Sequence, residues 1–131
     1  MKKGQAMLVA ILIIFVAAIA IALAAATVAM GQTQGTVNQR LSSEAYNLAA
    51  AAIDNTLMRM TRNDFTNPGT LSEGTTSSTI SISGSFPNYQ VLAVAESTSP
   101  ILGTKKVTRK IQADVTINNG VTTVTGYGEV Y

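Results

Sequence analysis

The sequence predicts an α+β fold, in which a long N-terminal α-helix packs by its second half on a small antiparallel β-sheet of about four strands. Two observations predict the helix, because residues 6–30 form an unbroken apolar run and residues 36–63 carry apolar side chains at helical spacing. The third observation is a set of alternating stretches and turn signals after residue 66. We divide the chain into a basic segment, an apolar helix, an amphipathic extension and a sheet domain, at residues 1–4, 5–30, 31–66 and 67–131.

Residues 6–30 are long enough to cross a membrane. The run has 25 residues with no charge and no proline, and as an α-helix it measures about 37 Å against a hydrocarbon core of about 30 Å. Lys2 and Lys3 precede it, and Arg40 is the next charged residue. Because positively charged flanks stay on the cytoplasmic side, we expect the N-terminus inside and residues from about 31 onward outside.

Small residues form a stripe along this apolar helix. Ala18, Ala22 and Ala26 stand four residues apart, which places them on one helical face. Such spacing lets helix backbones approach closely within lipid, so the stripe predicts partner helices. The alternative is an Ala-rich lipid anchor in which the stripe arises by chance.

Two glycines follow the apolar run. Gly31 and Gly35 stand in the sequence Gly-Gln-Thr-Gln-Gly, and each weakens a helix by about 1 kcal/mol relative to Ala. One interpretation is a flexible segment that can unwind and stretch. The other is a turn between two helices at the membrane boundary.

Residues 36–63 predict a helix with one buried face. Its apolar positions recur mostly every three or four residues and are Val37, Leu41, Ala45, Leu48, Ala52, Ile53, Leu57 and Met60. The turn sequence Asn67-Pro68-Gly69 follows. If the two helical segments join, residues 5–63 span about 88 Å, which a sheet domain of this size cannot cover. The first half is therefore expected in lipid or under other subunits.

The C-terminal part predicts strands after a polar loop at residues 70–78. The expected strands are Thr79–Ser83, Tyr89–Glu96, Lys105–Asn118 and Val121–Tyr131. The third alternates most clearly, with apolar residues at odd positions and one exception at Arg109. Asn119-Gly120 suits a two-residue type I′ hairpin turn. We expect an antiparallel meander whose apolar face is covered by the amphipathic helix.

The chain lacks two residue types on which much enzymatic and metal chemistry depends. The chain has no Cys and no His, so disulfides, thiolate metal sites and the commonest general base are absent. Its carboxylates are far apart in the sequence and show no metal-ligand spacing. The net charge of +2 comes from scattered residues and does not indicate nucleic-acid binding. We expect no enzymatic activity, no catalytic or metal-binding residues and no cofactor.

Residues 1–4 form a short basic segment that ends in glycine. Lys2-Lys3-Gly4-Gln5 leads directly into the apolar helix, and this start resembles the type III signal of type IV pilins and type II secretion pseudopilins. In that family a membrane peptidase cuts just after the Gly, which implies a four-residue leader here and a cut between Gly4 and Gln5. Most members carry Glu at the fifth mature position and often Phe or Met at the first, where this chain has Val9 and Gln5. The start is most similar to PilX-like or GspK-like subunits that lack the Glu.

The resemblance implies a structural subunit of a type IV pilus or pseudopilus. Such a subunit waits in the inner membrane with its N-terminus inside and then enters an extracellular filament through its apolar helix. The implied partners are copies of itself in a helical homopolymer or other pilins, the prepilin peptidase and pilus assembly machinery, and membrane lipid before assembly.

Two other interpretations stay open at this point. The first is a single-pass, membrane-anchored extracellular protein that does not polymerise, which leaves the processing motif without a reason. The second is a soluble secreted domain released by a cut near Ala26, although the apolar run exceeds the roughly 7–15 residues typical of a signal peptide.

Overall fold

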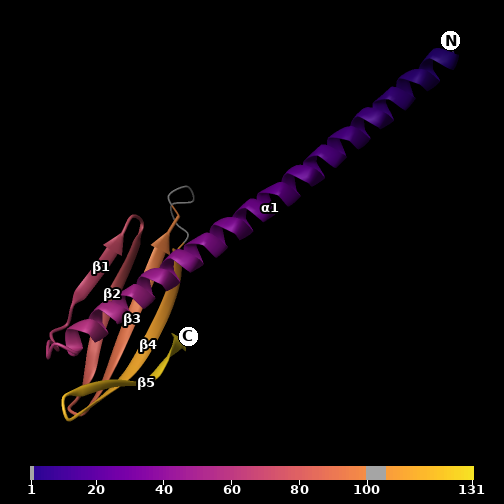
Figure 1. The fold of residues 1–131 in the computed structure, drawn as a ribbon. Coiled ribbons are helices and arrows are strands. Elements are labelled where there is room, and N and C mark those ends of the chain that lie inside the picture. Colours follow the sequence, from indigo (N-terminus) through magenta and orange to yellow (C-terminus); the bar gives the residue numbers. More distant parts are fainter. Residues whose placement is uncertain (1, 100–105) are drawn as a thin grey trace. The chain divides into compact units, whose positions relative to one another are not determined.

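The computed structural model describes residues 2–99 and 106–131, with side chains from residue 4 onward. The described residues form one helix followed by five strands, with the bounds α1 Lys2–Met60, β1 Gly69–Glu73, β2 Thr76–Ser85, β3 Asn88–Thr98, β4 Lys106–Asn118 and β5 Val121–Val130 (Figure 1). The second half of α1 packs on one face of the antiparallel sheet, so the predicted α+β fold is confirmed.

The chain consists of two compact units, Met1–Val37 and Asn38–Tyr131. The first unit contains helix alone, and its side chains up to residue 36 are exposed from residue 4 onward. The second unit contains the remainder of α1 and the whole sheet. The hydrophobic core lies entirely in this second unit.

Helix α1 continues through Gly31 and Gly35. The expected alternative of a turn between two helices is therefore wrong, because the backbone keeps its helical form across both glycines. Thr33 and Thr36 donate their hydroxyls to carbonyl oxygens one turn earlier, at 3.0 and 3.1 Å. That this segment unwinds under load stays a prediction.

The helix ends at Met60, slightly earlier than the predicted end near residue 63. Residues 61–63 form a turn, and Asn63 adopts a left-handed backbone with φ of 60°. Asn is one of the residues that tolerates this conformation just after a helix. Phe65 then stacks on Tyr89 of β3 with ring centroids 5.1 Å apart, which holds the connection to the sheet.

The sheet is a meander in the order β1-β2-β3-β4-β5 with every neighbouring pair antiparallel. The prediction of about four strands missed β1, and the expected polar loop at 70–78 is instead a hairpin. Gly74, with φ of 58°, supplies its turn. Leu71 pairs with Ser78 and turns its side chain toward the core side. A sequence of mostly polar residues becomes a strand here because β2 offers it a pairing edge.

The core forms where small residues of α1 meet small residues of the sheet. Ala45, Ala49 and Ala52 of α1 are fully buried, as are Ala93 and Ala95 of β3. Larger side chains fill the space around these alanines; they are Ile53, Met60, Ile80, Val91, Ile111 and Val115. The predicted alternation of β4 is confirmed, because residues 111, 113, 115 and 117 are buried and the residues between them are half-buried.

The β4–β5 hairpin turns where the sequence predicted. Asn119 and Gly120 both have positive φ, 52° and 78°, as a type I′ turn requires. The turn sets the register in which Asn118 pairs with Val121, and a bulge follows at Asp114/Val115. Strand β5 thus ends the sheet as an edge strand.

Candidate functional site

The first candidate site is the exposed apolar surface of α1. Fourteen large apolar side chains between Met7 and Met30 are exposed by 46–71%. The described residues include one helix that is long and apolar enough to cross a membrane, and its most apolar window buries none of its surface within the chain. This helix therefore presents a continuous apolar surface whose exposure to water is unfavourable.

The predicted helix-packing residues lie on this surface. Ala18, Ala22 and Ala26 are exposed and follow one another at one-turn intervals along α1. They leave a shallow stripe between bulkier neighbours such as Ile19 and Leu23. That partner helices pack against this stripe stays a prediction.

The predicted processing residues stand at the start of the same helix. Gly4 and Gln5 are both exposed, and a Cβ added at Gly4 would meet no other atom within 4 Å. Packing within the chain therefore does not require glycine at this position. The helix separates these residues from Gly31 and Gly35, so the structure does not bring the predicted sites together.

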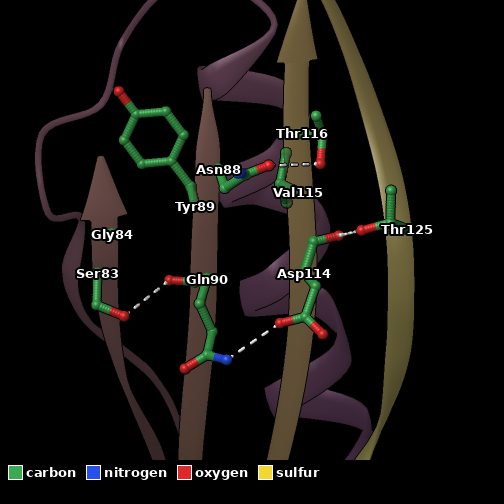
Figure 2. A pocket seen from close by; sticks show the side chains of 9 residues that line it. All are labelled: Ser83, Gly84, Asn88, Tyr89, Gln90, Asp114, Val115, Thr116 and Thr125. Atoms are coloured by element: carbon green, nitrogen blue, oxygen red, sulfur yellow. Dashed lines mark hydrogen bonds between the residues drawn. The ribbon is translucent and has the colours of Figure 1, made fainter. Parts of the chain in front are cut away.

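A second candidate is a polar hollow of about 370 Å³ on the sheet (Figure 2). Its floor carries Gln90 and Asn88 of β3 beside Asp114 and Thr116 of β4. These residues alternate with the buried Val91, Ala113 and Val115, so they belong to the face away from the core. The sequence predicted this face to be wet, but not that its side chains pair across strands.

Residues that line this hollow form hydrogen bonds with one another. The Gln90 amide donates to Asp114 Oδ1 at 3.1 Å, and Thr116 Oγ1 donates to Asn88 Oδ1 at 3.1 Å. Thr125 Oγ1 reaches the Asp114 carbonyl at 3.2 Å. These contacts are typical of cross-strand pairs that stabilise a solvated sheet. They place no nucleophile beside a base, and the hollow has no evident catalytic chemistry.

Arg109 explains the one exception in the alternation of β4. It lies on the core-side face and reaches out of the sheet, where its Nε donates to Ser42 Oγ of α1 at 2.9 Å. Its Nη1 donates to Glu129 Oε1 of β5 at 2.7 Å. One guanidinium thereby ties the helix, β4 and β5 together. The signal in the sequence was the charge at an odd position, but neither partner could be identified from spacing.

A hollow of about 440 Å³ lies beside this cluster. Polar side chains of α1 line it together with Tyr46, Arg109 and Glu129. Because the two charged groups already neutralise each other, the hollow offers no free charge to a ligand. We assign it a structural role.

A further ion pair closes the end of α1. Arg59 Nη2 donates to Asp64 Oδ2 at 2.7 Å, and Thr66 donates its hydroxyl and its backbone N–H to the other carboxylate oxygen. The hydrogen bond from the Thr66 hydroxyl, followed by that from Arg59, lowers the pKa of Asp64 from 3.8 to about 2. The group fixes the turn after the helix.

Strand β5 is covered less well than the rest of the sheet. None of its residues is buried, and Val124 and Tyr127 are 44% and 49% exposed. On the adjoining side of α1, Tyr46 is 42% exposed. Partial burial, followed by the charges of Asp54 and Tyr46, raises the pKa of Tyr127 above its usual value. The sequence did not predict this surface.

Within residues 2–99 and 106–131, no group of three acidic, His or Cys side chains is placed to hold a metal ion. No family model, curated protein or solved structure matches the chain. Function is therefore inferred from the surfaces described above.

Proposed function

We propose that the chain is a structural, pilin-like subunit of an extracellular type IV pilus or pseudopilus. It inserts in the inner membrane with its N-terminus inside, is trimmed between Gly4 and Gln5, and then polymerises through its apolar N-terminal helix. Its partners are copies of itself or other pilins, together with the prepilin peptidase and the assembly machinery. We also propose that the protein has no enzymatic activity.

The observation that carries the proposal is the contrast between the two halves of α1. The half after Asn38 buries one face on the sheet, whereas the half between Met7 and Met30 buries nothing within the chain. Full burial of a large apolar side chain is worth about 1.5–3 kcal/mol, so this half favours lipid or protein over water by tens of kcal/mol. A filament core supplies such a covering.

The stripe of Ala18, Ala22 and Ala26 supports the proposal that this helix exchanges its contacts with lipid for contacts with other helices. Lipid tails and a bundle of apolar helices are similarly apolar surroundings for this helix, so the free energy of transfer between them is close to zero. Close backbone approach over small residues adds van der Waals contacts that lipid does not supply as closely. These contacts favour the assembled state.

The test is an intact-mass measurement with N-terminal sequencing of material sheared from cells, together with electron microscopy of the same fraction. We expect fibres whose subunits begin at Gln5. A chain that keeps Met1 in membranes without fibres would instead support the membrane-anchored alternative. A soluble chain that starts near Thr27 would support the secreted domain.

A pair of variants makes the test sharper. Gly4→Leu is expected to stay uncut, with the mass of the full chain, and to form no fibres. The bulky side chain would stand at the proposed cleavage site without disturbing any contact within the chain. Lys3→Arg, which preserves the flanking charge, is the matched control and should be cut and assembled normally. Normal fibres from Gly4→Leu with a start at Gln5 would refute the assigned cut site.

A further inference from the structure

Strand β5 is the more open of the two edges of the sheet. It runs for ten residues and, in the described sheet, has β4 as its only neighbour. It contains no Lys and no Pro, and its one charged residue, Glu129, already forms an ion pair with Arg109. The opposite edge strand, β1, has five residues, follows Pro68 and ends at Glu73. Short length, Pro and charge all hinder pairing at a sheet edge, so a further strand meets less resistance at β5.

Four residues of β5 direct their backbone N–H and C=O groups to the free edge. The backbone N–H of Ile117 in β4 donates to the Pro87 carbonyl at 2.8 Å, on the side of β3. Successive residues of a strand bond toward opposite neighbours, so odd positions of β4 bond toward β3 and even positions bond toward β5. The residues of β5 that lie opposite the odd positions therefore bond outward; they are Thr122, Val124, Tyr127 and Glu129.

A bulge makes these four outward residues symmetric about the middle of the strand. Asp114 pairs with Gly126 and Val115 pairs with Val124, so Thr125 is the extra residue. Positions 122, 124, 127 and 129 therefore have the same spacing when they are read from either end. The bulge lies at the centre and leaves regular strand at residues 121–124 and 127–130. Such a strand can pair antiparallel with a second copy of itself.

One antiparallel register between two copies of β5 matches all four outward residues. It places Thr122 opposite the partner's Glu129 and Val124 opposite the partner's Tyr127. Any other register between two copies matches at most two of the four. No like charges meet in this register, because Glu129 is the one charged residue of the strand.

The side chains agree with the same register. Val124 and Tyr127 are 44% and 49% exposed, and both lie on the core-side face because they pair with the buried Val115 and Ala113. An aromatic residue opposite a β-branched one is a favourable cross-strand pair. On the other face Val121, which is 63% exposed, comes opposite an apolar residue, the partner's Val130. Apolar side chains thus meet on both faces.

We propose that two copies of the chain pair through β5, antiparallel and about a two-fold axis, so that their five-stranded sheets become one continuous sheet. Main-chain hydrogen bonds supply affinity, and the contacts between Val124 and Tyr127 on either side of the axis fix the register. The contact is isologous, because the same strand acts in both copies. It differs from the heterologous contacts that join successive subunits of a filament, and it does not rest on the proposed function.

Disulfide trapping tests the register, because the chain has no Cys of its own. In the proposed pair Thr123 lies opposite the partner's Gly128. Thr123 is exposed, and a Cβ added at Gly128 would meet no other atom within 4 Å. Opposite residues of an antiparallel pair have Cα atoms about 4.5–5.5 Å apart, which a disulfide can bridge.

We would mix full chains of Thr123→Cys and Gly128→Cys, distinguished by a mass tag, in a mild detergent with oxidised glutathione. Disulfide-linked heterodimers are expected. Homodimers of Thr123→Cys are not, because five strand residues separate that position from its copy, which is about 17 Å. The matched control replaces Thr123→Cys by Ser81→Cys, since Ser81 is also exposed but lies in β2.

Three outcomes of the trapping experiment would overturn the proposal. Homodimers of Thr123→Cys that form as readily as the heterodimers would show a different register. Equal trapping in the Ser81→Cys control would show random collision. A mixture of Thr123→Cys and Gly128→Cys without linked product would show that the two strands do not meet.

Sedimentation equilibrium of the full chain in density-matched detergent provides a second measurement. Val124→Lys should raise the dissociation constant of the dimer by about tenfold or more, because Lys hinders edge pairing and the two-fold axis brings the substitution into the contact twice. Val124→Thr keeps the β-branched shape and should change the constant by less than about threefold. Near-ultraviolet circular dichroism of the tyrosines checks that both variants are folded.

Unchanged dimerisation of folded Val124→Lys would place the contact elsewhere in the chain and would refute the pairing of β5. A parent chain that stays monomeric at every concentration would refute it as well. Because dimers are scored in detergent and fibres are scored by microscopy of sheared material, failure of this contact is distinguishable from failure of the proposed function.

Discussion

Two buried serines on adjoining strands should respond to the same substitution with opposite sign. Ser78 of β2 and Ser97 of β3 are both 0% exposed. Among the residues that the structure describes, Ser78 Oγ has no hydrogen-bond partner, whereas Ser97 Oγ accepts a hydrogen bond from Thr76 Oγ1 at 2.9 Å. Removal of one hydroxyl relieves an unsatisfied group, and removal of the other creates one.

The magnitudes follow from the burial of these groups. A buried polar group without a partner costs about 1–3 kcal/mol, so Ser78→Ala should raise the free energy of unfolding by about 1–2 kcal/mol. Ser97→Ala loses a hydrogen bond and leaves the Thr76 hydroxyl, in a side chain that is 5% exposed, without its acceptor. That variant should lower the free energy of unfolding by about 1–3 kcal/mol.

The assay is urea unfolding of the full chain in a mild detergent, followed by the near-ultraviolet circular dichroism of its tyrosines. This signal reports on the sheet unit, since all four tyrosines lie after residue 38. For a unit of this size, 1 kcal/mol corresponds to a shift of about 4–8 °C in the thermal midpoint, which gives a second measurement. Destabilisation by Ser78→Ala similar to that by Ser97→Ala would refute the reasoning.

Three further predictions concern stability. Arg109→Met should lower the free energy of unfolding by about 1–2 kcal/mol, because it removes the bonds to Ser42 and Glu129 at a site where both charged side chains are still partly solvated; Arg109→Lys should restore little in urea unfolding, and full recovery would argue against the geometry. Asp64, with its pKa lowered to about 2, stabilises the folded state above its unfolded pKa, and this contribution is lost as pH falls from about 4 toward 2; the urea midpoint of Asp64→Asn should lack that pH dependence. Ile53→Ala should cost about 2–5 kcal/mol because Ile53 is fully buried, and a loss below 1 kcal/mol in the same assay would contradict the assigned core.

The sequence predicted those elements whose local pattern agrees with their final environment. The odd positions of β4, the Asn119-Gly120 turn and the apolar stripe of α1 could all be identified, because periodicity and turn chemistry both act locally. Strand β1 was missed since its residues are mostly polar and its extended form depends on pairing with β2. Tertiary pairing decided a segment that its own sequence left open.

The candidate surfaces likewise comprise some that the sequence predicted and some that only the fold revealed. The exposed span and its alanine stripe could be found from composition and spacing alone, because the span is an unbroken uncharged run within one helix. The links from Arg109 to Ser42 and Glu129 join residues 67 and 20 positions apart, and no periodicity relates them. The uncovered part of β5 also required the fold, since it depends on where the helix stops covering the sheet.

The alanines at the helix–sheet contact connect the fold to the proposed assembly. Ala45, Ala49 and Ala52 of α1 are fully buried in the same core as Ala93 and Ala95 of β3, so the contact face of the helix is lined by small side chains. A narrow contact face leaves the rest of the helix circumference free, including the sides that carry Tyr46 and Met58. Larger residues at the contact would hold the helix farther from the sheet and widen the face that the sheet must cover. The small core therefore lets one helix bury a narrow face on its own sheet while Tyr46 and Met58 stay exposed.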